Sequence, residues 1–298
     1  MQPNWTHIPI MVKQIAAALL TKPDGVYVDG TLGLGGHSAY FLQQLSPEAQ
    51  IFGFDKDEEA LQMARQRIPD PRLHTFHASY TQAPLILQQA GLNGADGILL
   101  DLGLSSYQLD NPARGFSILQ SGPLDMRFDL SSSLTAAEIV NTWPLNELVR
   151  ILRDYGEERQ AEKIALAIMA ARKEAPLQTT EDLKKVVESV IPRYGKKHPA
   201  TQTFQALRIA CNAELETVET ALKTLPKLLR PGGRAAILTF HSLEDRLVKN
   251  HFKELAQSGD WNLLTKHAIA PDYEEVCHNR RARSAKLRLI ERSAHARF

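Results

Sequence analysis

The sequence is poor in cysteine and has no long hydrophobic run. Its two cysteines, Cys211 and Cys277, lie far apart in 298 residues and have no metal-ligand spacing, so neither a disulfide framework nor a bound metal is expected. No apolar stretch approaches the roughly 20 residues that span a bilayer. The first residues also lack the basic-then-apolar order of a signal peptide. We therefore expect a cytoplasmic protein without a membrane partner.

No charge of one sign dominates the chain. The 35 Lys and Arg residues nearly balance the 34 Asp and Glu residues, so the net charge neither favours nor excludes a nucleic-acid partner. The C-terminal segment is nevertheless basic and has a single acid, Glu291. Such a run is either a solvated face or a phosphate-binding surface. Its basic residues are Arg280, Arg281, Arg283, Lys286, Arg288, Arg292 and Arg297.

Short apolar runs alternate with helical patterns, which is typical of a parallel sheet with crossover helices. The fifth run, which begins at Ala235, comes much later than the about 30–40 residues that one crossover needs, so a second domain is inserted before it. We predict strands at Val26–Val28, Ile51–Phe54, Leu73–Phe76, Gly97–Leu100 and Ala235–Phe240, then at Trp261–Lys266 and Lys286–Glu291 with an irregular charged loop between these last two.

The inserted segment is predicted to be helical. Thr135 with Glu138, and Thr179 with Asp182, have the spacing of N-terminal capping boxes. The segment Glu157–Glu174 has apolar residues at helical intervals. These patterns indicate several short helices packed on one another.

One long amphipathic helix is predicted after the insert, because apolar residues recur every three or four positions from Phe204 to Leu225. The sequence Pro231-Gly-Gly233 then predicts a turn into the fifth strand. These boundaries divide the chain into a discontinuous domain, 1–110 and 206–298, and an inserted helical domain, 111–205.

The first predicted strand runs into a glycine-rich loop, Asp29-Gly-Thr-Leu-Gly33-Leu-Gly35-Gly36-His37. Glycines let a backbone approach a ligand beyond the carboxyl ends of strands. No register gives the G-x-G-x-x-G of a nicotinamide enzyme, and an acid followed four residues later by G-x-G has the spacing used for S-adenosylmethionine. The alternative interpretation is a tight turn without a ligand.

The next two predicted strands also end in candidate ligand-binding residues. Asp55 lies about 20 residues beyond the glycine loop, where a carboxylate can accept hydrogen bonds from two ribose hydroxyls. Asp57 is the better candidate for a helix N-cap. Tyr80 follows the third strand and either stacks on an adenine or belongs to the core.

The fourth predicted strand ends in an acid that suits methyl transfer to an amine. Asp101 is followed by Gly103, Ser105 and Ser106. The exocyclic amine of cytosine is a poor nucleophile, and a carboxylate that accepts hydrogen bonds from its N–H groups localises the lone pair. No cysteine lies near, which disfavours methylation of a ring carbon through a covalent adduct. Alternatively, Asp101 caps the following helix.

These motifs together closely resemble the bacterial small-subunit ribosomal RNA cytosine-N4 methyltransferases, the RsmH or MraW family. The matching segments span nearly the whole chain in order. They are His7-Ile-Pro, Asp29-Gly-Thr-x-Gly-x-Gly-Gly-His37, Asp101-Leu-Gly-x-Ser-Ser106, Gly115-Phe-Ser117, Pro123-Leu-Asp-Met-Arg127, Tyr155-Gly-Glu-Glu-Arg159, His198-Pro-Ala-Thr-x-Thr-Phe-Gln-Ala-Leu-Arg208, Phe240-His-Ser-Leu-Glu-Asp-Arg246 and Arg281-Ala-Arg-Ser-Ala-Lys-Leu-Arg288.

The resemblance implies an α/β class I (Rossmann-like) methyltransferase sheet with an inserted all-helical domain. It implies S-adenosylmethionine as the donor and, as the target, N4 of a cytidine in the decoding centre of 16S rRNA, within the small subunit or a late assembly particle. It leaves open whether the enzyme forms a homodimer. The implied catalytic residues are Asp101, Ser105 and Ser106, and the implied cofactor residues are Gly33, Gly35, Gly36, His37, Asp55, Tyr80, Asp101 and Gln108.

Basic residues near the motifs are expected to contact RNA phosphates, and His241 is expected to shape the cytosine pocket. Three rival functions are a DNA cytosine-N4 methyltransferase, an RNA-binding assembly factor with a vestigial pocket, and, least favoured, a dehydrogenase. The expected RNA-binding residues are Arg114, Arg127, Lys196, Lys197, His198, His241, Arg246, Arg281, Arg283 and Lys286.

Overall fold

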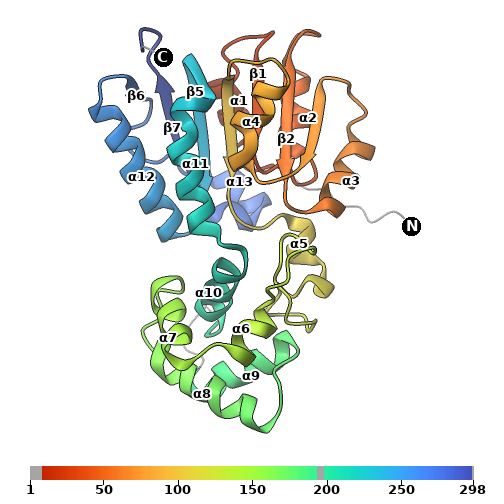
Figure 1. The fold of residues 1–298 in the computed structure, drawn as a ribbon, viewed down its shortest axis with the longest axis vertical. Coiled ribbons are helices and arrows are strands. Elements are labelled where there is room, and N and C mark those ends of the chain that lie inside the picture. Colours follow the sequence, from red (N-terminus) through yellow and green to blue (C-terminus); the bar gives the residue numbers. More distant parts are fainter. Residues whose placement is uncertain (1–8, 193–197, 297–298) are drawn as a thin grey trace. The chain divides into compact units, whose positions relative to one another are not determined.

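The computed structural model describes residues 9–192 and 198–296, which form two compact units (Figure 1). Unit 1 contains the described residues of Met1–Gly103 and Glu216–Phe298, and unit 2 is Leu104–Leu215. Unit 2 is therefore continuous in sequence, whereas unit 1 is built from both ends of the chain. At each end unit 2 extends beyond the inserted domain predicted at 111–205.

Unit 1 is built on a seven-stranded sheet of the described residues, in the order β3-β2-β1-β4-β5-β7-β6. The first five strands of the chain run parallel to one another, and β7 is antiparallel to both β5 and β6. This sheet confirms the predicted class I methyltransferase fold. The strands are β1 (Val26–Asp29), β2 (Gln50–Asp55), β3 (Leu73–His77), β4 (Ala95–Asp101), β5 (Leu229–Thr239), β6 (Trp261–Leu263) and β7 (Lys286–Arg292).

Helices pack on both faces of this sheet. Successive residues of a strand point to opposite faces, so apolar runs supply core residues to both sides. Along β4, Ile98 and Leu100 belong to the core cluster that includes residues of α4, α11 and α12, whereas Leu99 packs with residues of α1 and α2. The helices of the unit are α1 (Val12–Leu19), α2 (Gly36–Leu42), α3 (Glu58–Arg67), η1 (Tyr80–Gln82), α4 (Ala83–Gln89), most of α11 (Glu214–Leu228), α12 (Ser242–Gln257), α13 (Tyr273–His278) and η3 (Arg280–Ser284).

The register of the parallel strands brings Asp29, at the end of β1, and Asp101, at the end of β4, to one edge of the sheet. Tyr27 of β1 pairs with Gly97 of β4, and Asp29 pairs with Leu99, so β1 and β4 end close together. β2 is in register on the other side of β1, where Asp29 pairs with Gly53. The strands therefore end at the edge where ligands bind in open α/β sheets.

The predicted turn at Pro231-Gly-Gly233 is instead a bulge inside β5. Ala95 pairs with Leu229 and Gly97 with Arg234, so the register shifts across the glycines. Gly232 has a φ of 79°. A bulge of this kind bends a strand without ending it.

Two predictions near the C-terminus also differ from the structure. β6 ends at Leu263, short of the predicted Lys266. The predicted irregular loop contains a short helix, α13, in which Asp272 is the N-cap and accepts a hydrogen bond from the N–H of Glu275 (2.7 Å). The basic 3-10 helix η3 follows it directly.

Unit 2 is helical, as predicted, and its described residues contain no strand beyond an isolated bridge between Pro123 and Thr179. Thr135 and Thr179 are the N-caps of α6 and α9, which confirms both predicted helix starts. The elements are α5 (Ser106–Asp110), η2 (Pro112–Arg114), α6 (Ala136–Thr142), α7 (Leu145–Asp154), α8 (Ala161–Glu174), α9 (Thr180–Val190) and α10 (Thr201–Asn212), and the chain continues into α11 (Glu214–Leu228).

The prediction of one long helix from Phe204 to Leu225 was wrong. Ala213 has a φ of 47°, which separates α10 from α11. The side chain of Asn212 accepts a hydrogen bond from the N–H of Phe128 and donates one to the carbonyl of Met126, both at 2.7 Å. Tertiary hydrogen bonds therefore accompany the break.

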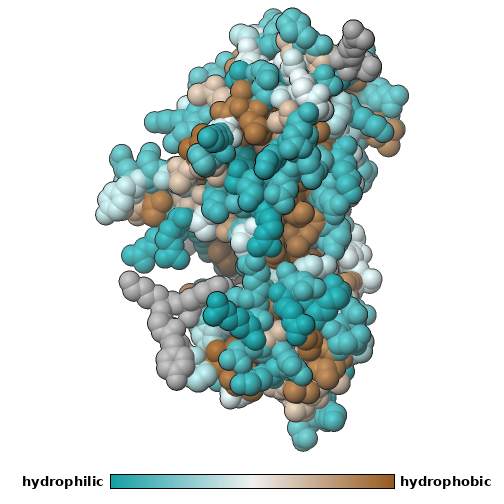
Figure 2. Space-filling view, turned by 90° about the vertical axis from the view of Figure 1, so that its left-hand side faces the viewer, coloured by the Kyte–Doolittle hydropathy of each residue, from teal (hydrophilic) through white to brown (hydrophobic). Residues whose placement is uncertain are grey.

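The surface carries hydrophobic residues only in scattered groups on the face that Figure 2 shows. Tyr273 and Leu119 are the most exposed large hydrophobic residues, at 85% and 86%. Every described helix is too short or too polar to cross a bilayer. Cys211 is buried and Cys277 is exposed, and both are free thiols, in agreement with the prediction.

Candidate active site

The glycine-rich loop leaves β1 in conformations that favour glycine. Gly33 has a φ of 53° and Gly35 one of 75°, and Gly35 is the N-cap of α2. A Cβ at Gly30 would lie 2.3 Å from the Leu100 side chain and 2.8 Å from Cβ of Tyr80. Close packing therefore explains Gly30, whereas backbone conformation explains the other two.

The Asp29 side chain stabilises the glycine-rich loop through hydrogen bonds. Its buried carboxylate accepts hydrogen bonds from the Ser38 hydroxyl (2.6 Å) and from the N–H of Thr31 (3.3 Å). Burial raises the pKa of Asp29 to about 6, although both hydrogen bonds lower it. Ser38 was not predicted as a site residue, although it stands where a nicotinamide-binding loop would have glycine.

Asp55 connects the end of β2 to the same loop. Its carboxylate accepts hydrogen bonds from the N–H of Gly33 (2.7 Å) and from that of Asp57 (2.9 Å). Burial raises the pKa of Asp55 to about 6. Asp57 is the N-cap of α3 and accepts a hydrogen bond from the N–H of Ala60, which confirms the N-cap role predicted for it.

Tyr80 begins η1 directly after β3 and packs, partly buried, against the core cluster that contains Leu100. Its Cβ is one of the groups that leave no room for a side chain at Gly30. The predicted aromatic residue is therefore next to the start of the glycine loop.

Asp101 ends β4 opposite the glycine loop. Its N–H donates to the Thr31 hydroxyl (2.7 Å), and its carboxylate lies 3.8 Å from Nδ1 of His37. Burial raises the pKa of Asp101 to about 6; the electrostatic effect of His37 lowers it, while Asp29 and Glu244 raise it. The alternative interpretation, that Asp101 caps the next helix, is wrong, because the N-cap of α5 is Ser105.

His37 is the second residue of α2 and is buried. Its Nε2 lies 3.0 Å from the carbonyl oxygen of Ile10, and its ring lies 6.2 Å from that of Phe41. The Ile10 carbonyl thus holds the Nε2 side of the ring, while the Nδ1 side faces Asp101. A backbone carbonyl in this role cannot be recognised from the sequence.

Three predicted residues of unit 2 form a helix start. The Ser105 hydroxyl accepts a hydrogen bond from the N–H of Gln108 (3.2 Å), and Oε1 of Gln108 accepts one from the N–H of Ser105 (3.1 Å). This capping box begins α5, whose first residue is Ser106. The structure therefore gives Ser105 and Gln108 a structural role that the sequence analysis did not predict.

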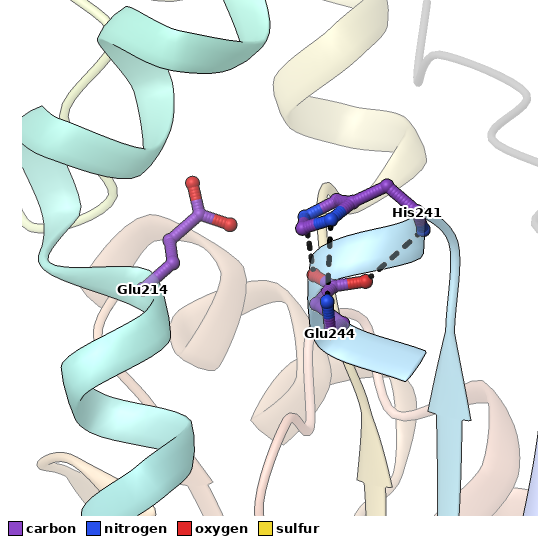
Figure 3. A group of neighbouring side chains, drawn as sticks. All are labelled: Glu214, His241 and Glu244. Atoms are coloured by element: carbon purple, nitrogen blue, oxygen red, sulfur yellow. Dashed lines mark hydrogen bonds and ion pairs between the residues drawn. The ribbon is translucent and has the colours of Figure 1, made fainter. Parts of the chain in front are cut away.

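A second capping box begins α12 in unit 1 (Figure 3). Glu244 is 1% exposed; its carboxylate accepts a hydrogen bond from the N–H of Phe240 (2.8 Å) and lies 3.0 Å from Nε2 of His241. His241 was predicted to contact the substrate, and its ring is turned to this carboxylate. Glu244 was missed as a residue that acts electrostatically on Asp101.

Arg114 and Arg127 of unit 2 were predicted to contact phosphates, but their guanidinium groups bind other groups of the protein. Arg114 is 3% exposed and donates to the carbonyls of Arg127 and Phe128, both at 2.9 Å. Arg127 donates to the Asp125 carboxylate, at 2.9 and 2.7 Å, and to the carbonyls of two loop residues. These guanidinium groups therefore hold the loop before α6 through hydrogen bonds to its backbone.

The remaining residues that were predicted to contact RNA lie partly in unit 2 and partly in unit 1. In unit 2, Nε2 of His198 lies 3.2 Å from the Glu188 carboxylate, while Lys196 and Lys197 lie outside the described residues. In unit 1 the other basic residues are exposed, and Lys286 also lies 3.2 Å from the Asp245 carboxylate. The exposed set comprises Arg246, Arg281, Arg283 and Lys286.

Unit 1 therefore brings three raised-pKa carboxylates, those of Asp29, Asp55 and Asp101, to the carboxyl edge of its parallel strands. Such an edge with glycine-rich backbone suits a nucleoside-containing cofactor. No nucleophilic cysteine lies in it among the described residues, since Cys211 and Cys277 are on α10 and α13.

Comparison with known proteins agrees with this geometry. Residues 4–293 match the model of the MraW methylase family. Three curated relatives, each called ribosomal RNA small subunit methyltransferase H, are 54% identical (Elusimicrobium minutum), 44% identical (Geobacter sp. strain M21) and 42% identical (Caldicellulosiruptor saccharolyticus), and each alignment covers 97% of this chain and 99% of the relative. The chain thus belongs to the MraW methylase family and is an S-adenosylmethionine-dependent methyltransferase.

Proposed function

We propose that the protein transfers a methyl group from S-adenosylmethionine to the exocyclic N4 amine of a cytidine in the decoding centre of 16S rRNA, with Asp101 orienting the amine. The relatives' names support ribosomal RNA of the small subunit as the substrate. The observation that carries the proposal is the partly buried Asp101 carboxylate at the end of β4, beside the glycine loop.

The residues of the loop fit the cofactor. The Asp55 carboxylate accepts one backbone hydrogen bond at each oxygen, so each oxygen keeps a lone pair for a ribose hydroxyl. The glycines let the loop backbone approach the cofactor without Cβ clashes. The proposed cofactor residues are Gly33, Gly35, Gly36, His37, Asp55, Tyr80 and Asp101 of unit 1, and Gln108 of unit 2.

The bound cofactor supplies an electrophilic methyl group on a sulfonium. Asp101 can accept hydrogen bonds from the amine N–H groups at both oxygens while it is ionised, and its pKa of about 6 keeps it ionised at neutral pH. A carboxylate held in place before the reaction localises the nitrogen lone pair without solvent reorganisation. Ser105 and Ser106 are proposed to border the amine.

The RNA is proposed to be bound within a small subunit or a late assembly particle in the cytoplasm. A base in folded RNA must leave its stack to reach the site. Unit 2 is proposed as the substrate-recognition domain, with His198, Lys196 and Lys197, while His241 borders the base. Arg246, Arg281, Arg283 and Lys286 are proposed phosphate contacts of unit 1.

The test measures transfer of a labelled methyl group to small subunits that lack the modification, with free 16S rRNA and DNA assayed in parallel. We expect label on cytosine N4. Asp101→Ala should lower the rate at least about a hundredfold, as expected for loss of one transition-state contact. Asp24→Ala is the control because Asp24 is exposed before β1, at the other end of the strand.

Each contrary result identifies a different error. Label on DNA alone would contradict the ribosomal substrate, and label on a ring carbon would contradict the role of the amine. Binding of subunits without any transfer would indicate an assembly factor. An Asp101→Ala rate equal to that of Asp24→Ala would remove Asp101 from the chemistry.

A further inference from the structure

Both ring nitrogens of His37 have a fixed neighbour. Nε2 lies 3.0 Å from the carbonyl oxygen of Ile10, and Nδ1 lies 3.8 Å from Oδ2 of Asp101. The His37 side chain is 6% exposed and that of Asp101 is 19% exposed. The imidazole therefore bridges a backbone carbonyl and the carboxylate that is proposed to orient the amine.

The Ile10 carbonyl determines where the ring protons lie. A carbonyl oxygen only accepts hydrogen bonds, so Nε2 must carry a proton. A neutral ring would then present a bare Nδ1 lone pair to an ionised carboxylate, which is repulsive in a buried site. A second proton between Nδ1 and Oδ2 removes this repulsion.

The other charged groups that act on Asp101 oppose its ionisation. Burial raises its pKa most, and the carboxylates of Asp29 and Glu244 raise it further. Among the described residues, His37 is the group whose charge favours the Asp101 anion. Glu244 already has a neighbour of its own, His241, at 3.0 Å.

We propose that His37 is a positioning residue that holds two ring protons and thereby keeps Asp101 ionised and ready to accept the N–H groups of the substrate amine. This inference rests on the proposed function, because that function assigns the amine to Asp101. His37 does not touch the reacting atoms in this account; apart from its proposed contact with the cofactor, it acts on the reaction through the carboxylate.

The carbonyl that orients His37 is itself held from the C-terminal part of unit 1. Met11 has a φ of 54°, and its N–H donates to the Glu275 carboxylate of α13 (2.5 Å). Ile10 and Met11 are both buried. A ring flip that turned Nδ1 away from Asp101 would therefore have to give up the Ile10 hydrogen bond.

The first test is the pH dependence of single-turnover methyl transfer by His37→Gln between pH 5.5 and 9. Glutamine can still donate to Ile10 but carries no charge. We expect the acid limb of the profile, near pH 6 in the wild type, to move up by at least about one unit. The rate should fall at least about threefold at pH 6.5 and about eightfold at pH 5.5, and it should approach the wild-type rate at pH 9.

His77→Gln is the matched control. Nε2 of His77 lies 3.0 Å from the carbonyl of Lys56 and its Nδ1 lies 3.7 Å from Glu58, so it has the same two kinds of neighbour at the surface. Its substitution should leave both the rate and the acid limb unchanged. A His37→Gln rate reduced by the same factor at every pH would overturn the proposal, because a purely structural role predicts that result.

The second test needs neither RNA nor a folded His37 variant. Nitrogen-15 NMR of wild-type protein at pH 7 should show both nitrogens of one buried imidazole protonated, and Asp101→Asn should convert that ring to the singly protonated form. A His37 ring with one proton in the wild type would overturn the proposal. Because this readout needs no substrate, an error in the substrate assignment leaves it intact.

Discussion

The Asp55 carboxylate accepts a hydrogen bond from the backbone N–H of Gly33 at 2.7 Å, so the end of β2 fixes the glycine loop after β1. Asp55→Asn should weaken S-adenosylmethionine binding about 10- to 100-fold, because charged acceptors make hydrogen bonds worth about 1.5–3 kcal/mol. Wild-type affinity should also fall as the pH drops through about 6, where Asp55 gains a proton. Calorimetric titration at several pH values measures both effects.

Asp57→Asn is the control for that titration. Asparagine caps helices about as well as aspartate, so α3 and the cofactor affinity should be retained. Equal affinities of the two variants would show that Asp55 does not bind the ribose.

Asp101→Asn should raise the apparent Tm at pH 8. The Asp101 pKa is about 6 in the folded protein and near 3.8 when unfolded, so the folded state binds more protons between these values and gains stability as the pH falls. Above pH 6 the charge costs up to about 3 kcal/mol, and each kcal/mol shifts Tm by roughly 2–4 °C. Scanning calorimetry should show the difference shrinking towards pH 4, and a difference independent of pH would contradict this origin.

At the opposite end of the sheet, we predict that Asp96 is the acid whose removal lowers the free energy of unfolding most. It is 2% exposed and accepts from the N–H of Val26 (2.9 Å), from Lys22 (2.6 Å) and from Arg230 (2.8 Å). Asp96→Ala should lower the free energy of unfolding by about 1–3 kcal/mol, because the buried N–H of Val26 loses its acceptor. Lys22→Ala, at a half-exposed position, should cost less than about 1 kcal/mol in the same urea titration.

The two thiols should react at very different rates. Burial raises the pKa of Cys211 to about 12, and its Sγ lies 3.0 Å from the carbonyl of Leu134, whereas Cys277 is exposed. Ellman's reagent at pH 8 should therefore modify one thiol rapidly and the other only after unfolding. Cys277→Ser should abolish the rapid phase, and a rapid phase that persists would show that Cys211 is accessible.

The sheet could be predicted from sequence because its signals are local. Each parallel strand is a short apolar run, and three of them end in an acid, Asp29, Asp55 or Asp101, at the edge where such sheets bind ligands. The spacing of these acids along the chain therefore predicted their meeting in space.

The residues that long-range contacts place could not be predicted in this way. Alanine favours helices, so nothing local marked the break at Ala213, which depends on hydrogen bonds between Asn212 and the distant Phe128. Arg114 looked like a phosphate contact because its charge is visible in sequence and its burial is not. The Ile10 carbonyl, which orients His37, is a backbone group that every residue type offers.

The interrupted connectivity of unit 1 has a consequence for biosynthesis. In the sheet, β4 lies between β1 and β5. When the ribosome has translated β4, β5 has not yet been made, and the whole of unit 2 must emerge before it. Unit 2 is contiguous and can condense while the nascent sheet still exposes an apolar strand edge, a surface that invites misassociation or chaperone capture. A circular permutant that begins at Glu216 would deliver β5 and β7 before β1, and it should shorten the time that this edge remains open.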